Sequence, residues 1–285
     1  MLKIGSLCTG YGGLDMAVEA YFGAETIWVS EFDKYASKVI EARINKPNFG
    51  NLKVIDWHNI EPIDILTAGY PCQPFSHAGL RKGAQDERHL WPYIKEAISI
   101  LRPSYVVLEN VRGHFGLGFR EVLSDLTDVG YDTRWTLIRA SDVGAPHRRE
   151  RLFILAYPNS SRPTRAKSCR VQEKEPEYSC DYLNEYTDTY CERCSLVGDE
   201  SRAQGHQGQS QSIARELVEA IYDKEIPPPL DEGKLNVKFV EYMMGLPDGW
   251  VTDIDLPRSQ KLKILGNGVV PQQAYKAIEL LHNVK

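Results

Sequence analysis

The chain has 285 residues, of which 42% are hydrophobic and 26% charged, as in one large globular domain or a large domain with a small one. This composition excludes collagen, a disordered tail and a disulfide-stapled miniprotein. No apolar run approaches the roughly 20 residues of a membrane span, and the start MLKIGSLCTG lacks a signal peptide's apolar region. We expect no membrane partner and a cytoplasmic location, with the cysteines as thiols or metal ligands.

The net charge of −5 excludes only a uniformly basic surface. Phosphate binding needs a local stripe of Lys and Arg. The chain offers such stripes at Arg81-Lys82, at Arg88, and at Arg148-Arg149 with Arg151. A nucleic-acid partner therefore remains open.

Short apolar runs and amphipathic stretches alternate over the first 157 residues. This alternation is typical of βαβ units around a largely parallel, doubly wound sheet. The pattern predicts strands at 3–8, 26–30, 53–56, 63–67, 105–109, 133–139 and 152–157, and helices at 14–22, 34–44, 91–101 and 120–129.

The composition changes at Pro158. From there to Ser212, the only Val, Ile, Leu, Met, Phe or Trp residues are Val171, Leu183, Leu196 and Val197, too few to close a core by burial alone. Globular composition returns at 237–285, where a helix is expected at 272–281. We therefore divide the chain into residues 1–157, 158–235 and 236–285.

Four cysteines lie in this core-poor segment. Cys191 and Cys194 have the spacing of zinc ligands, and Cys169 and Cys180 could complete a four-thiolate site. A bound metal would supply folding energy that the missing apolar residues cannot. Zinc sites usually present two close pairs, however, and Cys169 and Cys180 stand alone, so free thiols are the alternative.

A glycine-rich turn follows the first predicted strand and reads Cys8-Thr9-Gly10-Tyr11-Gly12-Gly13. Glycine lets the backbone approach a ligand closely at a helix N-terminus, as in nucleotide-like cofactor sites, although plain tight turns share the pattern. Glu31 and Asp56 end the second and third predicted strands. Each could accept a hydrogen bond from a ligand, Glu31 from a ribose and Asp56 from an adenine. The alternative is that each is a helix cap or an ordinary surface acid.

A stiff turn at the end of the fourth predicted strand carries a thiol. Cys72 lies between Pro71 and Pro74, so we expect its side chain to be held in a fixed direction at the edge where doubly wound sheets bind ligands. A buried structural cysteine is the alternative. The polar, glycine-bearing stretch 76–88 that follows has the composition of a mobile lid with a basic tip.

Four elements in chain order resemble the C5-cytosine DNA methyltransferases: Pro71-Cys72-Gln73, Glu109-Asn110-Val111, Arg149 with Arg151, and Gly266-Asn267-Gly268-Val269-Val270-Pro271. The resemblance covers residues 3–157 and about 237–280. It implies a Rossmann-like class I methyltransferase sheet, with a small, irregular target-recognition region inserted before the C-terminal segment. It also implies S-adenosylmethionine as cofactor and a cytosine flipped out of double-stranded DNA.

The resemblance also implies catalytic roles. Cys72 would add to carbon 6 of the cytosine, which makes carbon 5 reactive toward the methyl group. Glu109 would hold or protonate N3. Arg151 would reach the cytosine O2, and Arg149 would support the site or bind phosphate. The base that removes the proton from carbon 5 is not identified.

For the cofactor, the resemblance gives Glu31 to the ribose and Asp56 to the adenine, with Trp57 or Phe32 over the adenine face. The carbonyl of Tyr70 would accept from the cytosine amine. The expected cofactor contacts are Cys8, Thr9, Gly10, Tyr11, Gly12, Gly13, Glu31, Phe32, Asp56, Trp57, Gly69, Pro71, Leu90 and Asn267. The expected DNA contacts are Gln73, Ser76, Arg81, Lys82 and Arg88.

Three positions depart from the family pattern. Cys8 replaces a phenylalanine, so part of the aromatic packing around the cofactor is missing or comes from Tyr11. His147 replaces a glutamine, which keeps a hydrogen-bonding group but changes its donors. The stretch before Leu90 is one residue shorter than usual. None of these changes affects Cys72 or its proposed partners.

The sequence also allows alternatives to a DNA cytosine-5-methyltransferase. The same scaffold could methylate cytosine in transfer RNA, or serve as a noncatalytic DNA-binding protein, against which Cys72, Glu109 and Arg151 speak. A nicotinamide dehydrogenase shares the glycine turn, but its chemistry does not require Pro-Cys-Gln. We further expect a monomer that acts beside a cognate restriction endonuclease in a bacterial, archaeal or phage-encoded setting.

Overall fold

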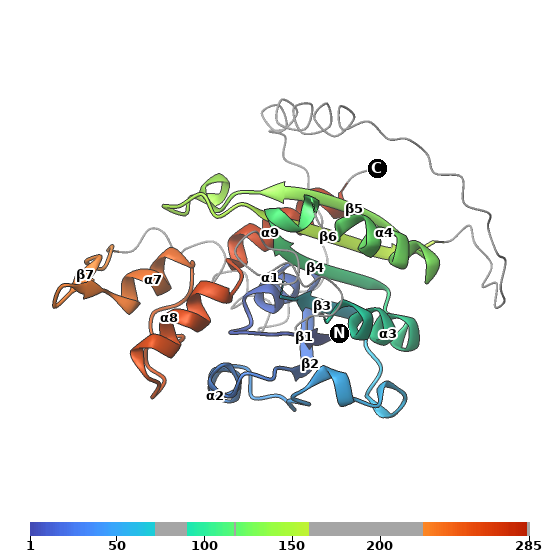
Figure 1. The fold of residues 1–285 in the computed structure, drawn as a ribbon, viewed down its shortest axis with the longest axis horizontal. Coiled ribbons are helices and arrows are strands. Elements are labelled where there is room, and N and C mark those ends of the chain that lie inside the picture. Colours follow the sequence, from blue (N-terminus) through green and yellow to red (C-terminus); the bar gives the residue numbers. More distant parts are fainter. Residues whose placement is uncertain (72–89, 117, 160–224, 284–285) are drawn as a thin grey trace. The chain divides into compact units, whose positions relative to one another are not determined.

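A six-stranded sheet forms the core of the computed structural model, which describes residues 1–71, 90–116, 118–159 and 225–283 (Figure 1). The strand order is β2-β1-β3-β4-β6-β5. The first four strands pair in parallel, and β6 runs antiparallel to both of its neighbours. The strands are β1 (Leu2–Leu7), β2 (Ala24–Ser30), β3 (Ile65–Gly69), β4 (Tyr105–Val111), β5 (Tyr131–Ile138) and β6 (Arg151–Pro158). The predicted α/β class is confirmed.

Helices connect and follow these strands. The longer ones are α1 (Gly13–Phe22), α2 (Lys34–Arg43), α3 (Trp91–Leu101), α4 (Phe119–Asp128), α7 (Val237–Met243), α8 (Arg258–Asn267) and α9 (Pro271–His282). The 3₁₀ helices are η1 (Leu52–Val54), η2 (Trp57–Asn59), η4 (Arg112–Gly116) and η5 (Ala140–Val143), and β7 (Leu230–Asp231) pairs with β8 (Lys234–Leu235). Every helix expected from the periodicity is present within a few residues of its predicted bounds.

One predicted strand is wrong. Residues 53–56 do not join the sheet but lie in η1 and the loop that precedes η2. Asn51 accepts a hydrogen bond from the amide of Lys53, and Asp56 accepts one from the amide of His58, so each side chain begins one of the 3₁₀ helices. Asn and Asp favour such local bonds to the backbone over a strand ladder, which explains the error.

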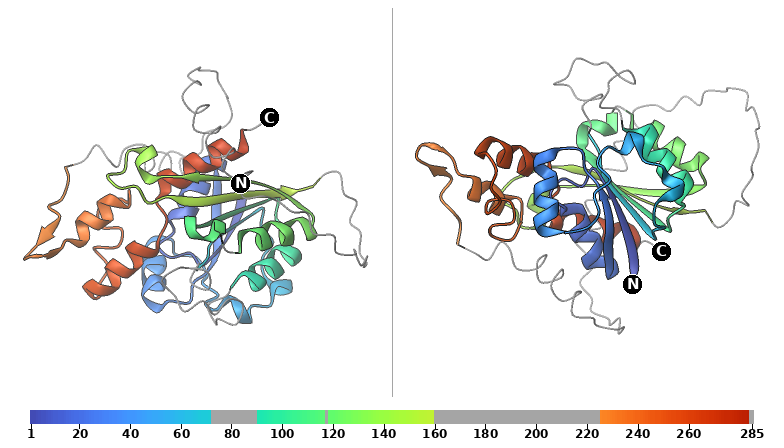
Figure 2. Two further views of the ribbon diagram at one scale, coloured as in Figure 1. Left: turned by 45° about the horizontal axis from the view of Figure 1, so that its top comes forward. Right: turned by 90° about the horizontal axis from the view of Figure 1, so that it is seen from below.

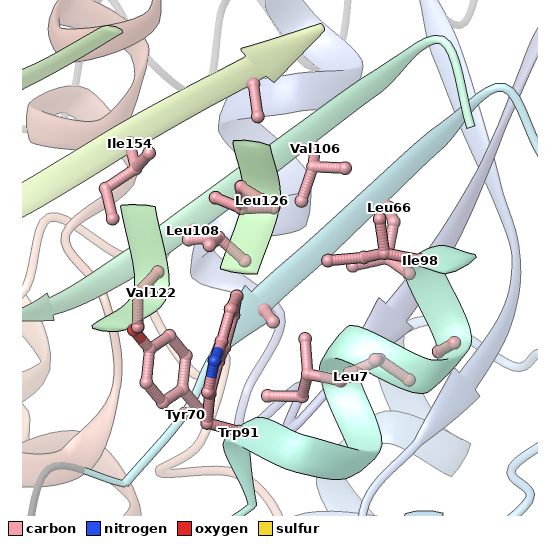
Figure 3. Close-up of a cluster of buried hydrophobic side chains, with 14 of the residues drawn as sticks. Leu7, Leu66, Tyr70, Trp91, Ile98, Val106, Leu108, Val122, Leu126 and Ile154 are labelled. Carbon is pink, nitrogen blue, oxygen red and sulfur yellow. The ribbon is translucent and has the colours of Figure 1, made fainter. Parts of the chain in front are cut away.

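Hydrophobic side chains alternate between the two faces of the sheet, as a strand period of two requires. Val106 and Leu108 of β4 pack on one face with residues of α3 and α4 (Figure 3). Val107, between them, packs on the other face with residues of α1 and α9. The helices therefore cover both faces of the sheet, which is the doubly wound arrangement (Figure 2).

The C-terminal segment packs against the beginning of the chain. Residues of α9 share a buried cluster with residues of α1, and residues of α8 share another with Tyr11 and residues of α2. This packing carries the predicted Gly266–Pro271 element to the glycine turn after β1. Within the described ranges, no helix is long and apolar enough to cross a membrane.

The described residues all belong to one compact unit. Residues 160–224 lie outside the described ranges. The division at 158–235 and the irregular recognition region therefore stay predictions.

Candidate active site

A cavity of ≈ 710 Å³ opens at the carboxyl ends of the parallel strands. Cys8 follows β1, Glu31 follows β2, Gly69 ends β3 and Glu109 lies near the end of β4, and all four line the cavity. Doubly wound sheets bind ligands at this edge, and the volume falls within the range of small-molecule sites. The predicted residues that line it are Cys8, Gly10, Glu31, Phe32, Gly69, Pro71, Leu90, Glu109, Arg151 and Asn267.

The glycine turn is held in its shape by Glu31. One oxygen of the carboxylate, Oε2, accepts from the amide of Gly10 at 2.9 Å, and Oε1 accepts from the amide of Asp33 at 2.8 Å. Burial raises the pKa of Glu31, and the two amide hydrogen bonds oppose this effect. Gly12, the N-cap of α1, has φ 87°, a left-handed conformation that glycine adopts without strain. The acid and the turn therefore form one preorganised wall.

Four predicted cofactor residues of this turn do not line the large cavity. Tyr11 is fully buried, and its hydroxyl donates to the carbonyl of Val269 at 2.7 Å. It therefore cannot replace the aromatic packing that Cys8 lacks. Gly12 and Gly13 serve the turn and the packing of α1, and Thr9 lines only a small adjoining cavity. Tyr11, Gly12 and Gly13 thus serve the fold in this structure, and their predicted contacts with the cofactor stay predictions.

Two residues predicted to contact the adenine, Asp56 and Trp57, lie at the start of η2. Asp56 is exposed and caps η2, while Trp57 is buried with its ring 6.2 Å from that of Trp28. Neither residue lines the cavity. Asn51, Leu52 and Lys53 line it instead. Asn is a residue type that often caps helices, and this was the signal for Asn51 in the sequence. The strand predicted at 53–56 did not take it into account. Phe32, the other predicted aromatic residue, lines the cavity with 78% of its surface exposed.

Glu109 and Arg151 form an ion pair in the cavity wall. Nε of Arg151 lies 3.0 Å from Oε1 of Glu109, and both side chains are largely buried. Burial raises the pKa of Glu109, against the opposing effect of Arg151 and Arg149. The pairing follows from register, because the antiparallel β4 and β6 place Val111 opposite Arg151 and Glu109 opposite Phe153. A carboxyl of raised pKa beside a guanidinium can donate a proton or a hydrogen bond to a ligand.

The neighbouring Asn110 was not among the predicted site residues, although it lies within the Glu-Asn-Val element. Its side-chain amide donates to the carbonyl of Tyr70 at 3.3 Å. That carbonyl is the predicted acceptor for the cytosine amine. Since a carbonyl has two lone pairs, Asn110 orients the group and leaves one acceptor position.

Arg149 acts as a brace for the late segment and does not line the cavity. Its Nη2 donates to the carbonyls of Gly266 and Gly268 at 2.8 and 2.6 Å, on either side of Asn267. Burial lowers its pKa, and the charge of Arg151 adds to this effect. Of the two predicted roles of Arg149, this geometry supports the first, support of the site.

The late segment approaches the glycine turn too closely for a side chain at Gly268. A Cβ atom there would lie 1.8 Å from the ring of Tyr11. We expect Gly268→Ala to lower the free energy of unfolding by about 3 kcal/mol, because a packed core cannot absorb such an overlap. Chemical denaturation measures the change. Gly266→Ala is the matched control, since its Cβ would meet nothing within 4 Å, and equal losses in the two variants would contradict the packing argument.

A buried carboxyl lies beneath the turn. Asp15 of α1 accepts from the hydroxyl of Ser6 at 2.9 Å and from that of Thr67 at 2.5 Å. It lines a cavity of ≈ 20 Å³ that shares Cys8, Gly69 and other residues with the large one. Burial raises the pKa of Asp15 to about 7, although both hydroxyl bonds oppose the shift. No motif in the sequence pointed to this residue.

Asp15 makes the stability of the protein depend on pH. Its folded pKa lies above its unfolded pKa of about 3.9, so its ionisation disfavours folding as the pH rises from about 4 to 7. Asp15→Asn removes this effect. We expect the free energy of unfolding of the variant, relative to wild type, to rise by roughly 3 kcal/mol between about pH 5 and pH 8. Thr67→Val, which keeps the carboxyl, should retain the pH dependence, and a difference independent of pH would refute the assignment.

Several predicted residues lie outside the described ranges. They are Cys72, Gln73, Ser76, Arg81, Lys82 and Arg88, and the four candidate zinc ligands Cys169, Cys180, Cys191 and Cys194. In the part of the chain that the structure describes, no group of three or more His, Cys, Asp or Glu residues could hold a metal ion. The zinc site, which falls elsewhere, stays a prediction without structural support.

Comparison with known proteins gives a consistent picture. A family model described as C-5 cytosine-specific DNA methylase matches residues 2–228. The type II methyltransferase M.NgoBI of Neisseria gonorrhoeae is 38% identical over 165 residues, which are 56% of this chain and 52% of that protein. M.HhaI of Haemophilus parahaemolyticus is 32% identical over 163 residues, 55% of this chain and 50% of that protein. The chain thus spans about half the length of the curated relatives it matches.

Solved structures share the fold. The Entamoeba histolytica methyltransferase EhMeth superposes with a TM-score of 0.63 at 19% identity, covering 100% of this chain and 99% of that one. The S. pombe Dnmt2 methyltransferase gives 0.61 at 17% identity, covering 100% of both chains. At these identities the likeness concerns the fold alone, and it agrees with the six-stranded sheet described above.

Proposed function

Because the chain belongs to the C-5 cytosine-specific DNA methylase family, we propose that it transfers a methyl group from S-adenosylmethionine to carbon 5 of a cytosine flipped out of duplex DNA. The observation that carries this proposal is the Glu109–Arg151 pair, 3.0 Å apart, in the wall of the cavity that Glu31 and Gly10 also line. A proton-donating carboxyl and a nucleoside-type site therefore share one cavity.

The residues of the cavity fit the proposed cofactor. Glu31 would accept from the ribose hydroxyls, since each of its oxygens keeps lone pairs beyond those used by Gly10 and Asp33. The exposed ring of Phe32 would cover one face of the adenine, with Asn51 and Leu52 along its edge. When bound, S-adenosylmethionine supplies the electrophilic methyl group. Asn267, braced by Arg149, would close the methionine end.

The proposed chemistry begins with the Cys72 thiolate. Its sulfur forms a bond to carbon 6 of the cytosine, and the ring electrons move toward N3, where Glu109 donates its proton or a hydrogen bond. Arg151 would hold the cytosine O2 and keep the carboxyl of Glu109 in place. Carbon 5 would then take the methyl group, while the bond between that group and the sulfonium sulfur breaks and the sulfur leaves as a neutral thioether. Loss of the carbon 5 proton restores the double bond and expels Cys72.

Base flipping explains why the site needs an enclosed cavity. An enzyme cannot reach carbons 5 and 6 of a stacked base, so the nucleotide must rotate into a pocket that reads its Watson–Crick edge. The Tyr70 carbonyl, which accepts a hydrogen bond from Asn110, and Glu109 would meet that edge. These groups recognise cytosine by one acceptor and one donor.

A methyl-transfer assay with labelled donor tests the proposal. We expect label in duplex DNA, and we expect duplex oligonucleotides with 5-fluorocytosine in the target motif to become covalently trapped on the protein. Bisulfite sequencing of DNA from cells that express the chain would identify the motif. Label in transfer RNA alone would favour the RNA alternative, and no label in either would refute a methyltransferase.

The remaining expectations stay predictions from the sequence. They are the cognate restriction endonuclease, the monomeric state and the cytoplasmic location. The type II methyltransferases among the relatives support the first of these.

A further inference from the structure

A row of three charged side chains lies directly outside the cavity wall. The register pairs Val111 of β4 and Ile138 of β5 with the same residue, Arg151 of β6. One residue further out on each strand are Arg112, Glu150 and Arg139. The carboxylate of Glu150 lies between the two guanidinium groups, with Oε2 2.6 Å from Nη1 of Arg112 and Oε1 3.3 Å from Nε of Arg139.

We propose that this Arg112–Glu150–Arg139 triad is a phosphate clamp for the DNA strand whose cytosine enters the cavity. The inference rests on the proposed function, and it adds residues that the sequence motifs do not assign to DNA. The triad begins one residue beyond Val111 and Arg151, which line the cavity. A nucleotide held in the cavity would place its flanking phosphates at this rim, beside the triad.

The charges and exposure of the triad suit this partner. Two guanidinium groups share one carboxylate, so the triad carries an excess positive charge. The side chains of Arg112 and Arg139 are 69% and 46% exposed, whereas that of Glu150 is 18% exposed. The acid therefore lies inward, and the guanidinium groups reach solvent. Each guanidinium has five N–H donors in a planar fork that matches phosphate oxygens.

Glu150 would hold both arginines in place before DNA binds. Its backbone carbonyl also accepts from Nη1 of Arg151 at 3.1 Å, so the triad is tied to the residue that pairs with Glu109. Exposed ion pairs contribute little to stability, so either arginine can turn toward a phosphate at small cost. Among the described residues, Asp142 is a further acid next to Arg139, and its carboxylate accepts from the backbone amide of Arg139 and not from its guanidinium.

A purely structural role is the competing explanation, because the triad also joins the β5–β6 hairpin to the end of β4. The two roles differ in their response to salt. Each phosphate contact releases counterions when the protein binds DNA. Loss of one contact therefore makes the slope of log K against log salt shallower by about 0.9. A structural clamp changes stability but leaves this slope unaltered.

The test is the affinity of the full-length chain for a fluorescent duplex of arbitrary sequence between about 50 and 200 mM salt. We expect Arg112→Ala and Arg139→Ala each to reduce the slope by about 0.9 and the affinity by roughly tenfold at 0.1 M salt, with the double variant losing about 1.8 in slope. Arg112→Lys should retain the slope, because it keeps the charge. Glu150→Gln should keep the slope or increase it, since it removes a competing anion.

Lys3→Ala is the matched control. Lys3 also forms an exposed ion pair, with Glu61. It lies at the amino end of β1, whereas the cavity lies at the carboxyl ends of the parallel strands. It should leave the slope unchanged. If wild type binds duplex DNA with a salt-dependent slope that the arginine variants share, the clamp is refuted and the triad is structural. If wild type binds no duplex DNA at all, the proposed function itself fails.

Discussion

Cys72→Ala is expected to abolish methyl transfer while leaving cofactor binding measurable. Without the sulfur atom, no group adds to carbon 6, and carbon 5 of cytosine is too weak a nucleophile to take the methyl group. The proposed cofactor contacts involve other residues, chiefly Glu31 and Gly10, which line the cavity and are hydrogen-bonded to each other. Single-turnover assays with labelled donor measure the rate, and calorimetry measures the binding.

The chain provides its own control thiol. Cys8 lines the cavity, and burial raises the pKa of its thiol, which disfavours the reactive thiolate. Cys8→Ala should therefore still trap a 5-fluorocytosine duplex, whatever it does to cofactor affinity. Substantial turnover by Cys72→Ala, or loss of trapping in Cys8→Ala alone, would show that the wrong sulfur has been chosen.

Glu109→Gln is expected to lower the rate of methyl transfer by about 10² to 10⁴-fold. Glutamine can donate a hydrogen bond to N3 but cannot transfer a proton. It also leaves the guanidinium of Arg151 without its carboxylate, 3.0 Å away in wild type. Since burial raises the pKa of Glu109, wild type holds the protonated form to a higher pH than an ordinary glutamate would. The rate per folded molecule, followed against pH, measures both effects.

Glu241→Gln is the control for a general effect of losing a buried acid. Glu241 accepts hydrogen bonds from the amides of Gly249, Val251 and Thr252 and does not line the cavity. Its variant should lose stability but keep the rate per folded molecule. Glu109→Asp, which retains the acid, should recover part of the lost rate. A Glu109→Gln enzyme with wild-type turnover would exclude the proposed proton donor.

Of the three predicted catalytic residues with described positions, Glu109 and Arg151 line the cavity, whereas Arg149 does not. Glu109 and Arg151 belong to short motifs at the ends of predicted strands. Strand pairing restricts the positions that such residues can take. The periodic elements were also predictable, because the alternation at Val106, Val107 and Leu108 follows from burial on both faces of a sheet. Cys72 belongs to the same kind of motif, and its role stays a prediction.

The error in the predicted strands occurred where side chains compete for the backbone. Residues 53–56 resembled a strand, but Asn51 and Asp56 instead begin two 3₁₀ helices. Asn51 and Leu52 line the cavity, whereas Asp56 and Trp57, which the family resemblance assigns to the adenine, do not. An isolated Asn or Asp does not reveal in sequence whether it caps a helix or ends a strand.

The sequence alone determined the α/β class, the edge of the sheet that carries the site, and the chemistry of its main residues, because hydrophobic period and short motifs are local properties. Only the tertiary structure decided which residues support the site through contacts with other parts of the chain. Tyr11 binds the carbonyl of Val269, Arg149 binds those of Gly266 and Gly268, and Glu150 joins two arginines. These contacts connect residues far apart in the chain, so they exist only once the late segment packs against the first helix and the strands align in register.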